Sequence, residues 1–319
     1  MNKKLLVVGM ATVFSLGLAA CNDGGSKATE KQKVSETSTS ETQTITYLKK
    51  DYTVPTDIKK VAAASLEAME DAAVLGVKPT GAITVGGKLP TYLAKDLEGA
   101  ESIGEKMQPN HEVLLKMKPD VILGTTKFQP EVAEKLGKVA TMIPVSHIST
   151  DWEANLRLMG EVSGTKEKAE EVIKQYKEDV AKVKASIEPK VKDKEAVVVR
   201  IRAGNMQVYP ASVYLNPVLY EDLGLTVPTE IKAVEKQEAI SIEKFAEMDP
   251  DIVFLQFDES ENAKTPKVLD ELQSNAIWKN LKAVKDNKVF INAVDPLAQG
   301  GTAWSKIAFL KAVEDKLTK

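Results

Sequence analysis

The fold is decided by the stretch EVLLKMKPDVIL, residues 112–123, because nearly the same pattern returns as EKFAEMDPDIVFL, residues 243–255. Each copy has a glutamate seven positions before the proline of a Pro-Asp pair, and a short apolar run follows the pair. Proline lacks an amide hydrogen and disfavours helix in the residue before it, so each helix is expected to end there. The apolar runs suit strands covered on both faces. A Pro-Asp turn alone is a common joint between helix and strand, but it leaves the matched glutamates unexplained, and the repeat predicts two similarly built lobes.

Strand-like and helix-like segments alternate around both copies, which indicates largely parallel sheets. Between the copies, residues 167–187 contain neither Gly nor Pro, and their apolar side chains recur at steps of three and four. This pattern predicts one helix from Thr165 to Glu188, about 36 Å long, which Pro189 would end. The sequence therefore predicts an α/β fold: two αβ lobes with largely parallel sheets, joined by one long rigid α-helix, with a ligand cleft between the lobes. The predicted boundaries are residues 45–160 for the N-terminal lobe, 161–189 for the linking helix and 190–319 for the C-terminal lobe.

The N-terminus has the form of a secretory signal: Lys3 and Lys4 precede an apolar stretch that is too short for a stable membrane span. The stretch LAAC, residues 18–21, resembles the processing box of bacterial lipoproteins. This resemblance implies that a signal peptide of residues 1–20 is removed and that lipid, palmitate included, is attached to Cys21. The protein would then be anchored on the extracytoplasmic face of the cell membrane. Residues 21–44 contain few aliphatic side chains and are expected to form a disordered tether.

Composition argues against several classes of function. The formal net charge of −3 over 319 residues disfavours a nucleic acid as partner. The chain has two histidines and one cysteine, so a dedicated zinc or manganese site would lack ligands. No nucleophile elbow, Walker loop or zinc-protease helix occurs in the sequence. We therefore expect a protein that is not an enzyme and has no resident cofactor or metal; a lipid-anchored enzyme is the alternative from a different class.

Together these features resemble one family, the helical-backbone substrate-binding lipoproteins of ABC importers for ferric siderophores, haem and vitamin B12. Residues 278–290, WKNLKAVKDNKVF, are similar to a signature of the iron-siderophore members, and residues 197–225 are similar to the opening of the second lobe in Gram-positive siderophore binders. The resemblance covers the chain from about residue 45 onward. It implies a monomer that captures a preformed ferric siderophore and delivers it to an ABC permease for iron uptake. The alternative is a haem or vitamin B12 binder of the same fold; Met107 or Tyr209 would supply an axial ligand to haem.

The resemblance also implies a role for the repeated glutamates. In this family, one glutamate on each lobe lies seven residues before the proline of such a turn and docks into an arginine pocket of the permease. Carried over, this implies docking through Glu112 and Glu243. Carboxylate–guanidinium pairs are oriented, so two separated pairs fix both position and rotation. Alternatively, each glutamate only occupies the first turn of a helix, where the helix dipole favours an anion.

The ligand site is expected in the cleft, at the carboxyl ends of the strands. Arg202 is the first candidate, because the resemblance places a ligand-contacting arginine there, and arginine suits the anionic oxygens of a ferric chelate. Arg200 lies two residues earlier on the same strand face and could equally be a solvated side chain. The further candidates, each of which could instead be a surface or core residue, are Lys88, Lys106, Lys127, Asn205, Tyr209, Tyr214 and Trp304. Asn205 stands where some citrate-hydroxamate binders have a histidine, so the class of siderophore stays open.

Overall fold

The structure is a computed structural model in which residues 41–318 are described. The predicted signal peptide and Cys21 lie outside the described residues. Among residues 41–318, no helix combines the length and the apolar character needed to cross a membrane. The predicted tether extends too far, because Thr42–Tyr47 form strand β1, which pairs antiparallel with β2 (Lys50–Pro55). Its polar side chains face solvent, whereas Ile45 and Tyr47 alternate with them and are buried, so this polar segment still forms a strand.

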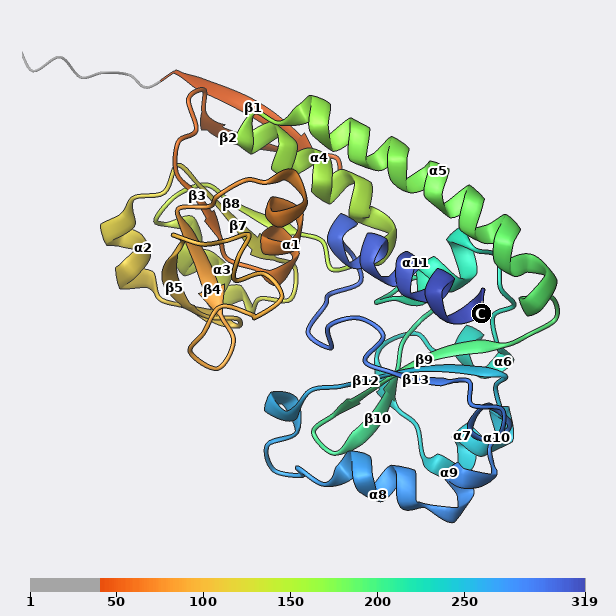
Figure 1. Cartoon of the computed structure of the whole chain (residues 1–319). Coiled ribbons are helices and arrows are strands. Elements are labelled where there is room, and N and C mark those ends of the chain that lie inside the picture. Colours follow the sequence, from red (N-terminus) through yellow and green to blue (C-terminus); the bar gives the residue numbers. More distant parts are fainter. Residues whose placement is uncertain (1–40, 319) are drawn as a thin grey trace, which may run out of the picture. The chain divides into compact units, whose positions relative to one another are not determined.

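The N-terminal lobe contains a largely parallel sheet, as predicted (Figure 1). Its strands follow the order β6-β5-β4-β3-β7-β8; the β5–β6 pair is antiparallel and the other pairs are parallel. The strands are β3 (Val61–Ala63), β4 (Gly81–Thr84), β5 (Glu101–Glu105), β6 (Gln108–Pro109), β7 (Val121–Thr125) and β8 (Met142–Val145). The helices are α1 (Leu66–Leu75), α2 (His111–Met117), α3 (Pro130–Gly137), the 3-10 turn η1 (Ser149–Asp151) and α4 (Trp152–Ser163). Strands β3, β4 and β7 are buried throughout, as expected for a sheet covered on both faces.

The C-terminal lobe contains a mixed sheet in the order β11-β10-β9-β12-β13. Its strands are β9 (Ala196–Arg202), β10 (Asn205–Val208), β11 (Glu238–Ala239), β12 (Ile252–Phe257) and β13 (Val289–Ile291). The helical segments are η2 (Val218–Asp222), α6 (Thr229–Lys232), α7 (Ile242–Met248), η3 (Glu259–Asn262), α8 (Val268–Ser274), α9 (Ala276–Asn280), α10 (Lys282–Lys285) and α11 (Ala303–Leu317). Strand β12 is parallel to β9 and β13, as predicted. Strand β10 runs antiparallel to β9, because Ala203 and Gly204 both adopt positive φ and form a tight hairpin turn.

Both copies of the sequence repeat form the predicted helix, turn and strand, as α2 and β7 in one lobe and as α7 and β12 in the other. Each helix is followed by a residue in the left-handed region, Lys118 at φ 51° and Asp249 at φ 39°, directly before the proline. The left-handed residue turns the chain, and the proline cannot continue the helix.

The aspartate of each turn ties two neighbouring strands together. Asp120 accepts hydrogen bonds from the backbone amides of Lys59 and Lys60, at 2.8 Å each, just before β3 begins. Asp251 accepts one from the backbone amide of Glu195, at 3.0 Å, just before β9 begins. In both lobes the tied strands are parallel neighbours in the sheet. The repeat therefore sets the register of a strand pair as well as the turn.

A single helix, α5 (Lys166–Val191), connects the N-terminal lobe to the C-terminal lobe, and Figure 1 shows it running past both. It has 26 residues, which gives a length of about 39 Å. The prediction that Pro189 ends it is wrong, because the helix continues to Val191. Proline removes one backbone hydrogen bond, but Ile187 and Val191 are buried on the same helix and stabilise its last turns.

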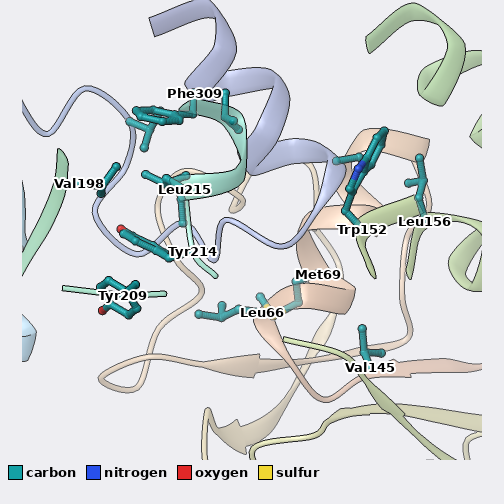
Figure 2. Packing of buried hydrophobic residues seen from close by; sticks show 14 of the residues in the cluster. Leu66, Met69, Val145, Trp152, Leu156, Val198, Tyr209, Tyr214, Leu215 and Phe309 are labelled. Atoms are coloured by element: carbon teal, nitrogen blue, oxygen red, sulfur yellow. The ribbon is translucent and has the colours of Figure 1, made fainter. Parts of the chain in front are cut away.

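The helices next to the lobe junction pack on one another. Helix α11 lies against α5 and α1, and α4 also lies against α5 and α1. Figure 2 shows part of this packing, in which Leu66 and Met69 of α1, Trp152 and Leu156 of α4, and Phe309 of α11 are buried. Burial of a large apolar side chain stabilises the fold by about 1.5–3 kcal/mol. Helices α1, α4, α5 and α11 therefore form one packed layer next to the lobe junction.

Candidate functional site

A cavity of about 570 Å³ lies between the two lobes. Most of its lining residues follow the carboxyl ends of strands, where α/β folds bind ligands. From the N-terminal lobe these are Val85 after β4, Lys106 and Met107 after β5, Lys127 after β7, and His147 and Ile148 after β8. The C-terminal half of the chain contributes Arg200, Arg202, Tyr209, Tyr214, Glu261 and Gln299. The volume is in the range of small-molecule binding sites.

Two arginines and one carboxylate form the C-terminal wall. Arg200 and Arg202 are two positions apart on β9, so their side chains leave the same face of the sheet. Glu261 joins them: its Oε2 accepts a hydrogen bond from Nε of Arg200 at 2.9 Å, and its Oε1 lies 3.4 Å from Nε of Arg202. The side chain of Arg200 is 5% exposed and that of Arg202 is 38% exposed. The expected alternative of a solvated Arg200 is therefore wrong, because Glu261 compensates for burial of its charge.

Tyr214 has an unusual backbone conformation beside this wall. Its φ of 60° lies in the left-handed region, which is rare for an aromatic residue. Its carbonyl accepts a hydrogen bond from the Ser149 hydroxyl at 2.7 Å. Gly300 packs so closely that a Cβ atom there would lie 2.3 Å from the Tyr214 carbonyl carbon. These contacts hold the ring 5.3 Å from the Arg200 guanidinium carbon and 4.8 Å, between centroids, from the ring of Tyr209.

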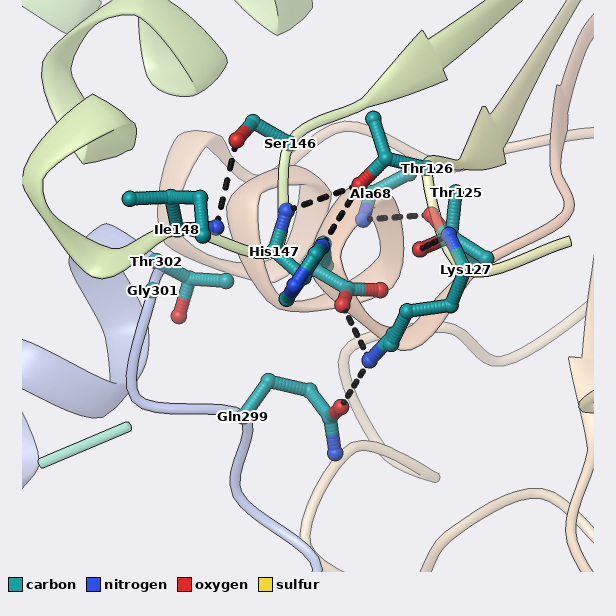
Figure 3. A network of polar contacts seen from close by, with 12 residues as sticks. Ala68, Thr125, Thr126, Lys127, Ser146, His147, Ile148, Gln299, Gly301 and Thr302 are labelled. Atoms are coloured by element: carbon teal, nitrogen blue, oxygen red, sulfur yellow. Dashed lines mark hydrogen bonds and ion pairs between the residues drawn. The ribbon is translucent and has the colours of Figure 1, made fainter. Parts of the chain in front are cut away.

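The N-terminal wall contains a lysine and a histidine in a polar network (Figure 3). Nζ of Lys127 lies 2.6 Å from Oε1 of Glu67 and donates a hydrogen bond to Oε1 of Gln299 at 3.1 Å. Glu67, in the first turn of α1, is 2% exposed. Nδ1 of His147 lies 2.7 Å from the hydroxyl of Thr126. Burial, together with the nearby charge of Lys127, lowers the pKa of His147 below its ordinary value.

The cavity has an excess of positive charge. Five cationic side chains line it against two carboxylates: Lys106, Lys127, Arg200, Arg202 and Lys236 against Glu235 and Glu261. Burial lowers the pKa of Lys106 to about 8, and repulsion from Lys127 and Arg200 acts in the same direction. Because the whole chain has a net charge of −3, this local excess indicates a site for an anionic ligand. Among residues 41–318, no cluster of three or more His, Cys, Asp or Glu side chains could hold a metal ion.

Six of the predicted binding residues line the cavity: Lys106, Lys127, Arg200, Arg202, Tyr209 and Tyr214. The structure places three others outside the lining. Lys88 belongs to an exposed turn. Asn205, next to the β9–β10 turn, is exposed and donates to the Ala203 carbonyl at 2.9 Å. Trp304 packs in the first turn of α11 against Tyr92, with ring centroids 4.7 Å apart.

Three residues that shape the site were not predicted from the sequence: Glu67, His147 and Glu261. His147 and Glu261 follow the carboxyl ends of β8 and β12, which is the signal that identified Lys127 after β7. They could have been found by the same rule. Glu67 contacts the site through Lys127, from a part of the chain that only the tertiary structure brings to it, whereas Gln299 lines the cavity itself.

The repeated glutamates occupy equivalent positions. Glu112 and Glu243 are the second residues of α2 and α7, and both are exposed. Each helix begins with a capping side chain, because Asn110 accepts a hydrogen bond from the amide of Glu112 at 3.0 Å and Ser241 accepts one from the amide of Lys244 at 3.3 Å. Both glutamates therefore present a carboxylate on an ordered first turn, and a role in docking stays a prediction.

The chain belongs to the periplasmic binding protein family, whose model matches residues 61–293. It is 47% identical over 319 residues to the iron-uptake system-binding protein of Bacillus subtilis (strain 168), and this match covers 99% of each chain. Its structure is similar to that of the triscatecholate siderophore binding protein FeuA from Bacillus subtilis complexed with ferri-bacillibactin. The TM-score is 0.84 at 50% identity, covering 86% of this chain and 98% of the other.

A second solved structure is similar at lower identity. SirA of Staphylococcus aureus complexed with staphyloferrin B has a TM-score of 0.75 at 26% identity, covering 86% of this chain and 98% of the other. The family consists of substrate-binding proteins rather than enzymes. The predicted fold class and the sequence-based assignment to a family that includes siderophore binders are confirmed.

Proposed function

We propose that this protein captures a preformed ferric siderophore of the triscatecholate class and delivers it to an ABC permease for iron uptake, without performing a chemical reaction. One observation carries the proposal: the cavity between the lobes is lined by five cationic side chains and two carboxylates. A ferric triscatecholate is an anion, because the charges of its catecholate oxygens together outweigh that of Fe(III). The likeness to a protein solved with such a ligand supports the same class.

In this proposal the two walls hold the chelate from opposite sides. Arg202 and Lys127 donate charged hydrogen bonds to catecholate oxygens. Tyr209 and Tyr214 supply apolar surface beside them. The lobes, which we assign to residues 45–160 and 190–319 with β1 added to the first, close modestly on the ligand, while the linking helix limits the movement.

Delivery takes place at a membrane in this proposal. The signal peptide of residues 1–20 is removed, and lipid on Cys21 anchors the protein to the extracytoplasmic face of the cell membrane. Glu112 and Glu243 dock into arginine pockets of the permease, one from each lobe. Their matched positions in the two copies of the repeat support this role.

Equilibrium dialysis against a panel of chelates tests the function. A ferric triscatecholate, a ferric hydroxamate, ferric citrate, haem and cobalamin are compared, with the bound ligand measured by its visible absorption. This readout does not depend on Trp304, which packs outside the cavity lining. We expect the triscatecholate to bind at least about tenfold more tightly than the hydroxamate, the worth of one charged hydrogen bond. Tighter binding of haem or cobalamin, or no binding of a ferric chelate, would overturn the proposal.

A further inference from the structure

Glu261 places a carboxylate inside a cavity that otherwise suits an anion. Its side chain is 13% exposed and contacts both arginines of the C-terminal wall. Nε and Nη2 of Arg200 each lie 2.9 Å from its Oε2, and Nε of Arg202 lies 3.4 Å from its Oε1. This carboxylate repels an anionic ligand, so it does not favour binding by charge. Its contacts with both arginines indicate a role other than direct attraction of the ligand.

The segment that carries Glu261 is held firmly. Asn262, which is 1% exposed, donates to the Ile201 carbonyl at 2.9 Å and accepts from the Gly204 amide at 3.0 Å. The carbonyl of Glu261 accepts from the Ala203 amide at 3.0 Å. These bonds attach η3 to the β9–β10 turn, directly beside the arginines. The position of the carboxylate is thus set by the fold before a ligand binds.

A fixed carboxylate changes which anions the arginines can bind. Without a partner, two neighbouring guanidinium groups would reorient toward any small anion. Glu261 occupies Arg200 and orients Arg202, so that a small anion entering this wall meets a carboxylate as well as a cation. A large chelate can bind Arg202 and the lysines of the opposite wall without displacing the carboxylate. Pre-organisation of Arg202 also lowers the cost of ordering it on binding.

We propose that Glu261 is a specificity-determining residue: it positions Arg202 and occupies Arg200, so that the cavity selects a large ferric chelate over small anions. This inference rests on the proposed function, because it takes a ferric triscatecholate as the ligand. Glu261 acts through the arginines and is a positioning residue.

Three variants separate orientation from charge. Glu261→Gln removes the charge and keeps one acceptor oxygen, whereas Glu261→Asp keeps the charge and shortens the reach toward Arg202. Glu235→Gln is the matched control, because Glu235 lines the same cavity and is exposed. Within residues 41–318 it has no ion pair with an arginine or lysine. It therefore removes the same charge without disturbing the arginines.

The experiment measures two binding constants for each protein at constant ionic strength: that of a ferric triscatecholate, and that of inorganic phosphate as its competitor. Selectivity is their ratio. We expect both Glu261 variants to lower the selectivity by about tenfold or more, the worth of one charged hydrogen bond. Glu235→Gln is expected to strengthen the binding of both anions slightly. The ratio of the two binding constants should stay within about twofold of the wild-type ratio, because an exposed charge contributes little.

The outcomes are distinct. Selectivity in Glu261→Asp equal to that of the wild type, or equal shifts in Glu261→Gln and Glu235→Gln, would overturn the inference. If Glu261→Gln fails to fold because the buried Arg200 loses its counter-charge, Glu261→Asp still decides the question, since it retains that charge. Failure of the wild-type protein to bind the triscatecholate would refute the proposed function instead.

Discussion

The two lobes share the same helix–turn–strand repeat, yet they line the cavity with different sets of cations: the N-terminal lobe contributes only lysines, whereas both lining arginines, together with Lys236, come from the C-terminal lobe. The C-terminal wall has arginines on a strand, fixed by Glu261. The N-terminal wall has lysines that follow strand ends, and the pKa of one of them, Lys106, is lowered to about 8 by burial and by neighbouring cations. Guanidinium is planar and always protonated, whereas an ammonium is a flexible point charge whose pKa shifts readily. We therefore propose that the C-terminal wall recognises ligand geometry, while the N-terminal wall supplies charge that responds to pH.

Replacement of Arg202 tests the C-terminal wall and should have the largest effect on affinity. In Arg202→Ala the chelate loses a charged hydrogen bond, worth about 1.5–3 kcal/mol. We therefore expect the dissociation constant to rise roughly 10- to 100-fold in equilibrium dialysis. Arg157→Ala is the control, because Arg157 pairs with Glu170 and Glu153 and does not line the cavity. If the dissociation constant of Arg202→Ala changed by less than about twofold, Arg202 would not contribute to recognition of the chelate.

A pH titration of chelate binding tests the role of Lys106 in the N-terminal wall. Its pKa of about 8 in the protein without ligand should rise when an anion binds, since the anion favours the protonated form. Above pH 8 binding must then take up a proton, so affinity falls as pH rises, by up to about tenfold between pH 7 and pH 9. Lys106→Met should remove this dependence when the same chelate is titrated. Parallel pH profiles in the two proteins would contradict it.

Much of the fold could be predicted because local rules determine it. The prolines after α2 and α7 and the apolar periodicity of α5 act within a few residues, and each was visible in the sequence. The β1–β2 hairpin was missed because its turn residues, Leu48 and Lys49, adopt positive φ without the Gly or Asn that usually marks such a turn.

The site could be predicted only in part. Lys106 and Lys127 follow strand ends, which is a sequence-level signal. Burial of Arg200 could not be predicted, because it depends on Glu261, 61 positions away in the sequence. The partner of Lys127 likewise depends on how α1 packs against the strand ends.

Replacement of Lys127 tests a second cation of the N-terminal wall. Nζ of Lys127 lies 2.6 Å from the carboxylate of Glu67, which already compensates much of its charge. We therefore expect Lys127→Ala to lower chelate affinity by only about two- to fivefold. Stability should fall more clearly, by about 1–3 kcal/mol in urea unfolding, because the buried Glu67 loses its ion-pair partner. The double variant Glu67→Gln/Lys127→Ala should regain part of this loss, since its buried side chain is uncharged. A double variant less stable than Lys127→Ala would show that Glu67 is stabilised by other contacts.

The smallest effect on affinity is expected where the lobes are most alike. Glu112 and Glu243 are exposed at the second position of α2 and α7, outside the cavity lining. The double variant Glu112→Ala/Glu243→Ala should therefore bind the chelate as tightly as the wild type, yet abolish uptake of the iron chelate by cells, because both oriented pairs with the permease are lost. Glu247→Ala, an exposed glutamate of the same helix as Glu243, should leave uptake intact.

The two single variants then decide whether the lobes dock equally. Equal partial losses of uptake mean that the repeat serves the permease symmetrically. A loss of uptake confined to one variant would mean that one lobe dominates docking. The glutamate of the other lobe would then only stabilise its helix, by interacting with the dipole at the first turn. Weaker chelate binding in the double variant would argue against docking altogether. Glu112 and Glu243 lie outside the cavity lining, so a docking role alone does not affect binding of the chelate.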